Sequence, residues 1–162
     1  MTPGDKRVPD LVHSSSEQGH ALGASGASWS GDLDRIDAPA HCTYARYESD
    51  EVTGTCPVTS QPDFYIVTVE VIPKKYLPES KSLKLYLQAF AKDGGIFGEA
   101  LAEKIATELE EALEAQSVAC TVKQKSRGGI TIAARSVVPG PANDGRERTL
   151  PMLMMTAAGK EF

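Results

Sequence analysis

Alternating hydrophobic positions predict strands in four segments of the chain. The strongest is residues 64–72, FYIVTVEVI, where β-branched and aromatic side chains occupy both faces. Because both faces are mostly apolar, we expect this strand to be covered on each side. One face carries Tyr65, Val67, Val69 and Val71, and the other carries Phe64, Ile66, Thr68 and Ile72. Shorter runs predict further strands at residues 41–48, 118–125 and 129–138.

Two other stretches have helical spacing. The first begins at Ser80 and is expected to stop at Gly94 and Gly95, which disfavour continuation of a helix. The second covers residues 97–115 and has apolar side chains four apart, which is typical of a buried helix stripe. The stripe consists of Phe97, Leu101, Ile105, Leu109 and Leu113. The charged residues Glu103, Lys104, Glu110, Glu111 and Glu114 are expected on its solvated face.

The predicted order of elements is strand, strand, helix, helix, strand, strand. Two hairpins around a helix pair predict an α+β domain over residues 39–138, with an antiparallel four-stranded sheet and both helices on one face. The exposed edges of such a sheet need covering or pairing. Residues 1–38 are rich in Ser, Gly and Ala, have no period, and are expected to be a flexible tail in which Trp29 is a lone aromatic. Residues 139–162 are expected to form a second tail.

Composition narrows the possible functions. The formal net charge of −5 argues against a broad nucleic-acid-binding surface, so we expect no direct nucleic-acid contact. No apolar run is long enough to span a membrane. The cysteines at positions 42, 56 and 120 are odd in number and scattered, which indicates a reduced cytoplasmic protein. No Cys or His pair has metal-ligand spacing, so no metal site is expected.

The candidate chemistry lies in the segment TCPVTSQPD, residues 55–63. Pro57 and Pro62 each lack an amide donor and restrict the preceding residue, so we expect a stiff loop over residues 49–62. It carries Cys56 and ends at Asp63, immediately before the strongest strand. A thiol and a carboxylate held this way fit a nucleophile and a proton donor. Taken alone, the pair is better explained as a small buried cysteine and a turn-capping aspartate.

Three later motifs change that balance: ESKSLKLYL at residues 79–87, FGE at residues 97–99 and RGGI at residues 127–130. With CPVTSQPD before them, the chain from Glu51 to Ile132 resembles the nitrile reductases of queuosine biosynthesis. The resemblance implies reduction of 7-cyano-7-deazaguanine by NADPH. It also implies the tunnelling fold, in which subunits join edge to edge into rings that stack, here as a homodecamer with one module per chain. The active sites of this family lie between subunits.

The resemblance also assigns roles to individual residues. Cys56 adds to the nitrile carbon to give a thioimide, and Asp63 protonates the nitrogen. The substrate-binding positions are Pro78, Glu79, Ser80, Gly98 and Glu99, and the cations for the NADPH phosphates are Lys81, Lys84 and Arg127. Without the family, Glu99 is a first-turn glutamate favoured by the helix dipole, and the three cations are solvated surface charges.

One departure from the family pattern stands at Gly98, where the family has a histidine that helps to position substrate and relay protons. Glycine supplies neither donor nor acceptor. Its presence keeps a second hypothesis open, an amidinotransferase that captures the same nitrile but adds ammonia to give archaeosine in nucleic acid. The retained cations favour reduction over that alternative. A third hypothesis, a non-catalytic deazapurine-binding module, is disfavoured by the retention of Cys56 and Asp63.

Overall fold

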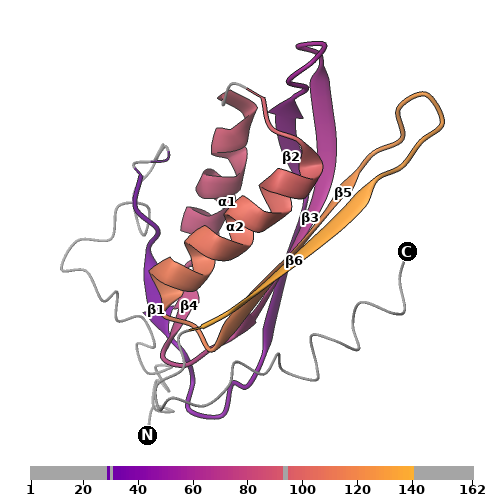
Figure 1. Cartoon of the computed structure of the whole chain (residues 1–162). Coiled ribbons are helices and arrows are strands. Elements are labelled where there is room, and N and C mark those ends of the chain that lie inside the picture. Colours follow the sequence, from indigo (N-terminus) through magenta and orange to yellow (C-terminus); the bar gives the residue numbers. More distant parts are fainter. Residues whose placement is uncertain (1–28, 30, 93–94, 141–162) are drawn as a thin grey trace, which may run out of the picture.

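The computed structural model describes residues 29, 31–92 and 95–140. Its main body is a four-stranded antiparallel sheet with strand order β2-β3-β5-β6. Two helices, α1 and α2, pack against one face of that sheet (Figure 1), which confirms the predicted antiparallel sheet with a helix pair. The large elements are β2 (Ala45–Thr55), β3 (Pro62–Ile72), α1 (Ser80–Ala89), α2 (Gly98–Leu113), β5 (Ser117–Gln124) and β6 (Ala133–Pro139), with a 3₁₀ turn at Phe90–Lys92.

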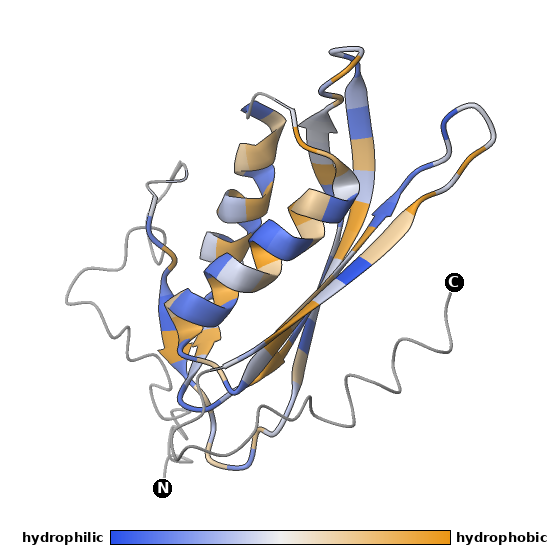
Figure 2. Ribbon diagram, in the orientation of Figure 1, coloured by the Kyte–Doolittle hydropathy of each residue, from blue (hydrophilic) through white to orange (hydrophobic). Residues whose placement is uncertain are grey.

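The core lies between the helix pair and the sheet. The predicted stripe of α2 is buried as expected at its last four positions, and so is the predicted inner face of β3. These fully buried side chains are Tyr65, Val67, Val69, Val71, Leu101, Ile105, Leu109 and Leu113. Figure 2 shows the same alternation of apolar and polar positions along the strands. Phe97 was wrongly placed in the stripe, because it lies at the N-cap of α2 and is 58% exposed.

The first strand differs most from its prediction, since β2 includes residues 49–55, which were expected to be loop. Its pairing with β3 shifts register between Ser49 and Val52, as at a β-bulge. The bulge interrupts the alternation at residues 49–51, which are all polar, so the pattern did not show that the strand continues. Val52 is buried beyond it and pairs with Tyr65.

A small second sheet was not predicted. Strand β1 (Arg35–Asp37) pairs antiparallel with β4 (Tyr76–Pro78), so the described fold begins before residue 39, the predicted domain start. Trp29 is not isolated either, because its ring lies 5.1 Å from that of Tyr86 on α1. The first strand of this pair is too short for a period to show, which explains why the pattern did not reveal it.

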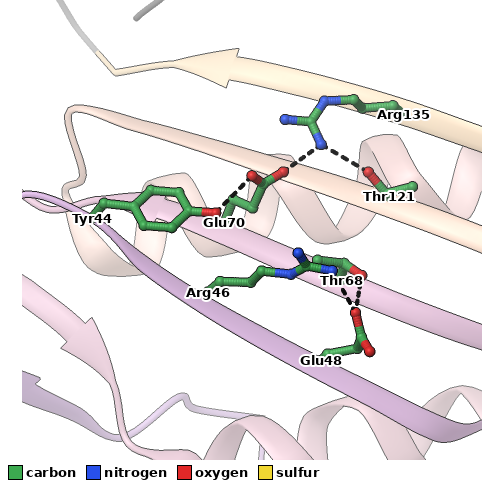
Figure 3. A network of polar contacts seen from close by, with 7 residues as sticks. All are labelled: Tyr44, Arg46, Glu48, Thr68, Glu70, Thr121 and Arg135. Atoms are coloured by element: carbon green, nitrogen blue, oxygen red, sulfur yellow. Dashed lines mark hydrogen bonds and ion pairs between the residues drawn. The ribbon is translucent and has the colours of Figure 1, made fainter. Parts of the chain in front are cut away.

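The sheet face opposite the helices is polar along its centre, not covered on both sides as predicted for β3. There Glu70 accepts hydrogen bonds from Tyr44, at 2.8 Å, and from Arg135, which also donates to Thr121 at 2.9 Å. Figure 3 shows this network, with Arg46, Glu48 and Thr68 beside it. Glu70 is therefore buried by its own partners, whereas Phe64 on the same face is 49% exposed.

The hairpin between β5 and β6 ends in the predicted RGG turn. Arg127 and Ile130 exchange both backbone hydrogen bonds at 3.0 Å, and Gly128 and Gly129 between them have φ of 58° and 83°. Positive φ at both central residues is the requirement of a type I′ turn, which glycine meets without steric cost. From this turn the Arg127 side chain reaches Asp63 and Gln61.

Most of both predicted tails, residues 1–28, 30 and 141–162, and the predicted helix stop at Gly94 lie outside the described residues. Within the described part of the chain, neither helix is both long and apolar enough to cross a membrane.

Candidate active site

A cavity of about 450 Å³ opens at one end of the main sheet. Three segments at that end of the sheet (Figure 1) contribute to its lining: the turn after β2, the beginning of α2 and the β5–β6 hairpin tip. Its lining comprises Cys56, Pro57, Asp63, Tyr65, Ile96, Phe97, Gly98, Glu99, Gln124, Arg127, Ile130 and Ile132. Its volume is in the range of small-molecule sites. Five sequence-predicted site residues therefore line one cavity.

The turn at residues 56–61 holds the thiol. The N–H of Cys56 donates to the carbonyl of Gln61 at 2.9 Å, and the N–H of Ser60 donates to the carbonyl of Cys56 at 2.9 Å. Ser60 has φ of 56°, the left-handed conformation that closes the turn. The expected stiff loop is thus shorter than residues 49–62 and is closed by its own backbone.

The same turn favours the thiolate form of Cys56. Hydrogen bonds to its sulfur from the Thr59 hydroxyl, and from the backbone N–H groups of Thr59 and Val58, lower the pKa of Cys56 to about 7, with a smaller contribution from Arg127. The thiolate is the reactive form, so a substantial fraction of Cys56 is reactive near neutral pH.

The other two thiols differ from Cys56. Cys120 is fully buried in β5, and burial raises the pKa of Cys120 to about 12. Cys42 precedes β2, and its Sγ lies 3.6 Å from the carbonyl of Tyr44. Of the three, only Cys56 lines the cavity.

Asp63 is the buried carboxylate of the cavity, 3% exposed. Its Oδ1 accepts a hydrogen bond from Nη1 of Arg127, and its Oδ2 accepts one from the Tyr65 hydroxyl at 3.4 Å. Nη2 of Arg127 also donates to Gln61 at 3.1 Å. Arg127, expected to meet a cofactor phosphate, therefore ties the hairpin tip to the turn and lies beside the predicted acid.

Gly98 and Glu99 begin α2 and both line the cavity, with Glu99 exposed. A Cβ at Gly98 would lie 3.6 Å from Cε1 of Tyr65 and 3.8 Å from Cγ1 of Val122, which are ordinary contacts. The absence of a side chain at Gly98 is thus not enforced by steric conflict at Cβ.

The predicted group at residues 78–84 does not join the cavity within one chain. It lies where β4 leads into α1, and α1 begins at the opposite end of the sheet from the cavity (Figure 1). Pro78 is buried opposite Arg35, and Lys81 and Lys84 lie on α1. The Glu79 carboxylate caps α1 by accepting from the N–H groups of Lys81, at 3.0 Å, and Ser82, at 2.8 Å.

Ser80 donates its hydroxyl to the same carboxylate, at 3.2 Å. Glu79 and Ser80 thus have a local structural role, and their substrate-binding role stays a prediction.

Two residues beside the reactive groups were not among the predicted site residues. Thr59 lies inside the quoted motif but received no role. Tyr65 was assigned only to the core, although the period of a strand places it on the same face as Asp63 two residues earlier. That alternation was the available signal for Tyr65.

The family-model match and the sequence relatives of the chain agree on one family. A family model described as QueF-like protein matches residues 62–139. A protein of Chlorobium phaeovibrioides named NADPH-dependent 7-cyano-7-deazaguanine reductase is 42% identical over 81 residues, which cover 50% of this chain and 69% of the relative. A protein of the same name from Methylorubrum extorquens is 42% identical over 102 residues, covering 62% and 66% of the two chains.

Coverage of the relatives varies, and the match to a reductase of Rhodopseudomonas palustris spans 52% of that protein. Among solved structures, the archaeosine synthase QueF-Like in its apo form aligns with a TM-score of 0.57. It is 21% identical in sequence, and the alignment covers 65% of this chain and 99% of that one. This likeness concerns the fold.

Proposed function

The chain belongs to the family of NADPH-dependent 7-cyano-7-deazaguanine reductases, and we propose that it reduces the nitrile of that compound to an aminomethyl group. The observation that carries the proposal is the convergence of Cys56, Asp63 and Arg127 on one cavity. A nitrile reductase needs a nucleophile and a proton donor close together, and these residues supply both.

Cys56 begins the reaction. A nitrile carbon accepts hydride poorly, so the thiolate adds first: an S–C bond forms, one C–N π bond breaks, and the nitrogen takes a proton from the Asp63 carboxyl. The product is a thioimide, which is far easier to reduce, so that covalent catalysis divides one hard step into easier ones. The lowered pKa of Cys56 supplies the thiolate for this addition.

Two hydrides and two protons convert the nitrile into the amine, and bound NADPH supplies the hydrides. When the thioimide is reduced, the C–S bond breaks and the thiolate of Cys56 is regenerated. The resulting imine takes the second hydride. Asp63 and solvent supply the protons on nitrogen.

The cavity also offers recognition of the base. The Glu99 carboxylate faces it from the first turn of α2 and can accept from an amino group and a ring N–H together. Phe97 and Ile130, 58% and 67% exposed, border the same cavity and can cover a flat heterocycle. Gly98, between Phe97 and Glu99 in the chain, adds no polar side chain to the cavity.

The cations of the chain fit NADPH only in part. Lys81 and Lys84 are three residues apart on α1, which places them on one side of the helix, where they can hold a phosphate. Arg127 is at the other end of the sheet, paired with Asp63. One chain therefore does not gather all three predicted cations.

We infer that the missing half of the site comes from a second copy. The cavity holds the nucleophile and acid, whereas residues 78–84 lie at the far end, as a site shared between two subunits requires. Strands β2 and β6 are the edges of the main sheet and are available for pairing. This arrangement supports the tunnelling fold and stacked rings, with a decamer as the expected assembly.

Subunit complementation tests the shared site. Cys56→Ala and Lys81→Ala/Lys84→Ala proteins are each expected to be inactive. After mixing and subunit exchange, intact sites should form where each variant supplies its undamaged half, at about a quarter of positions for random closed assembly. Light scattering measures the oligomer. Mixtures that stay inactive despite demonstrated exchange contradict the shared site.

Intact-protein mass spectrometry tests the reaction itself. Protein mixed with 7-cyano-7-deazaguanine alone should gain the mass of one ligand, and NADPH should discharge the adduct as the amine. A parallel sample receives ammonia in place of NADPH. Discharge by ammonia alone would contradict the reductase and support the amidinotransferase. A protein that gains no ligand mass in any sample would contradict both.

A further inference from the structure

Tyr65 is a polar side chain of the cavity to which the proposed reaction assigns no role. It is 1% exposed, and its ring lies between two glycines. A Cβ at Gly54 would lie 3.2 Å from Cε2 of Tyr65, and one at Gly98 would lie 3.6 Å from Cε1. Because neither glycine has a side chain, the ring fits between them, and Tyr65 lines the cavity.

The hydroxyl of Tyr65 is directed at the predicted acid. It donates to Oδ2 of Asp63 at 3.4 Å, while Arg127 donates to Oδ1, so each carboxylate oxygen has its own donor. The distance is long for a hydroxyl donor, as hydrogen bonds of catalytic groups often are before ligand binds. Burial, reinforced by Asp63, raises the pKa of Tyr65 to about 12, so the hydroxyl keeps its proton and remains a donor.

We propose that Tyr65 is a positioning residue that holds Asp63 for proton transfer to the nitrile nitrogen, an inference that rests on the proposed function. The Asp63 carboxyl gives its proton to nitrogen as the S–C bond forms and becomes a carboxylate. Tyr65 and Arg127 then stabilise that carboxylate by donating to its two oxygens. Tyr65 neither gains nor loses a proton in the cycle.

The position of Tyr65 also explains how the site functions with a glycine at position 98. The beginning of α2 contributes no donor there, and the nearest side chain is the Tyr65 ring. The polar atom on this wall comes instead from strand β3, through the Tyr65 hydroxyl. Proton transfer in this protein therefore depends on a strand residue two positions after the acid.

Tyr65→Phe is the direct test, because it keeps the ring between the glycines and removes only the hydroxyl. Adduct formation without NADPH should slow about 10²-fold, the lower end of what general acid–base catalysis contributes. Ligand affinity, measured by calorimetry on a Cys56→Ala background, should stay unchanged. The matched control is Tyr86→Phe, which loses a hydroxyl bonded to Glu108 at 2.6 Å between the helices, and its adduct rate should equal that of the unmodified protein.

A double-mutant cycle with Asp63→Asn separates positioning from packing. If Tyr65 acts through Asp63, Tyr65→Phe slows the Asp63→Asn protein no further. If Tyr65→Phe acts only through packing, it slows adduct formation by the same factor in the wild-type and in the Asp63→Asn protein, and that result overturns the proposal. The comparison remains valid if Tyr65→Phe also lowers the thermal midpoint.

The possible failures can be told apart. If the wild-type protein forms the adduct but yields no amine with NADPH, the reductase is contradicted. The effect of Tyr65→Phe on the rate of adduct formation is still measured in that case. Equal adduct rates for Tyr65→Phe and the unmodified protein overturn the Tyr65 inference and leave the reductase standing. No adduct in the unmodified protein overturns both.

Discussion

Two clusters in this molecule each combine a buried carboxylate with a tyrosine and an arginine. In one, Glu70 accepts hydrogen bonds from Tyr44 and Arg135, and in the other, Asp63 accepts them from Tyr65 and Arg127. Both carboxylates are 3% exposed. Burial raises the pKa of Tyr44 and of Tyr65 to about 12, with the adjoining carboxylate adding to the effect in each case. Residue types alone do not distinguish the clusters.

The surroundings of the two clusters distinguish them. Glu70 lies near the end of β3, and its arginine is 13% exposed and shared with Thr121. Asp63 lies at the beginning of the same strand, its arginine is 36% exposed, and both line the cavity beside Cys56. A buried ion pair alone is therefore as consistent with a structural role as with a catalytic one. The neighbouring thiol and the open cavity favour the catalytic role for the Asp63 cluster.

The largest expected effect comes from removing the thiol, which is the feature that the Glu70 cluster lacks. Cys56→Ala should abolish both the adduct and turnover, because no other described cysteine lines the cavity. Mass spectrometry with the nitrile measures this. Cys42→Ala is the control and should retain full adduct formation, while an adduct on Cys56→Ala would show that the nucleophile is misassigned.

The two carboxylates should separate activity from stability. Asp63→Asn should lower turnover by roughly 10²–10⁴-fold, since the amide cannot act as the acid. Glu70→Gln should leave turnover nearly intact but destabilise the fold by about 3 kcal/mol, because Arg135 loses its buried counter-charge.

Steady-state kinetics and thermal melts of the two variants check this pair. For a folded domain of about 100 residues, the loss at Glu70 corresponds to a midpoint lowered by about 12–24 °C. If Glu70→Gln lost turnover without losing stability, the structural assignment of its cluster would be wrong.

Gly98→His tests whether the Asp63 cluster lacks a proton relay. The new Cβ fits beside Tyr65, so the variant should fold. We expect the unmodified protein to accumulate the thioimide and release amine slowly, and the histidine to raise turnover about tenfold or more while adduct formation changes little. Gly98→Ala is the control for bulk. A folded Gly98→His protein that is no faster would show that the site lacks nothing at this position.

The arginines lead to a prediction about the cofactor. Arg127 is exposed enough to reach a phosphate and Arg135 is not, so NADPH should outperform NADH by about tenfold or more, given one charge-assisted contact to the 2′-phosphate. Lys81→Ala and Lys84→Ala should each reduce that ratio. Rates with both cofactors at several concentrations measure it, and equal rates in the unmodified protein would remove the reason for assigning these cations.

The smallest expected effect concerns the turn. Thr59→Val removes the hydroxyl that contributes most to lowering the pKa of Cys56, so that pKa should rise from about 7 towards that of an ordinary thiol. Since only the thiolate reacts, alkylation by iodoacetamide should rise with pH through about 7 in the unmodified protein and at higher pH in the variant. Thr68→Val, which removes a hydroxyl that donates to Glu48 on the other face of the sheet, is the control. An unchanged alkylation profile for Thr59→Val would refute this account of Cys56 activation.

Sequence alone was sufficient wherever the relevant interactions are local or periodic. The four-residue spacing of α2 identified Leu101 and its successors as core, and alternation identified the inner face of β3. The short separation of Cys56 from Asp63 placed both at one strand end. The four motifs led to the correct family because they occur in the family's order.

Tertiary structure alone decided the contacts that join distant segments. Arg127 lies 64 positions from Asp63, and only the folding of the β5–β6 hairpin beside β3 brings the two together. Tertiary structure also decided where β2 ends. The strand continues past a bulge that the sequence did not reveal, because its register depends on the partner strand. Tyr65 reads as one core residue among valines along the chain, and its role follows from two glycines and an aspartate that pack around it. Periodicity reports which face a side chain occupies, whereas its neighbours on that face depend on how the strands and helices are assembled.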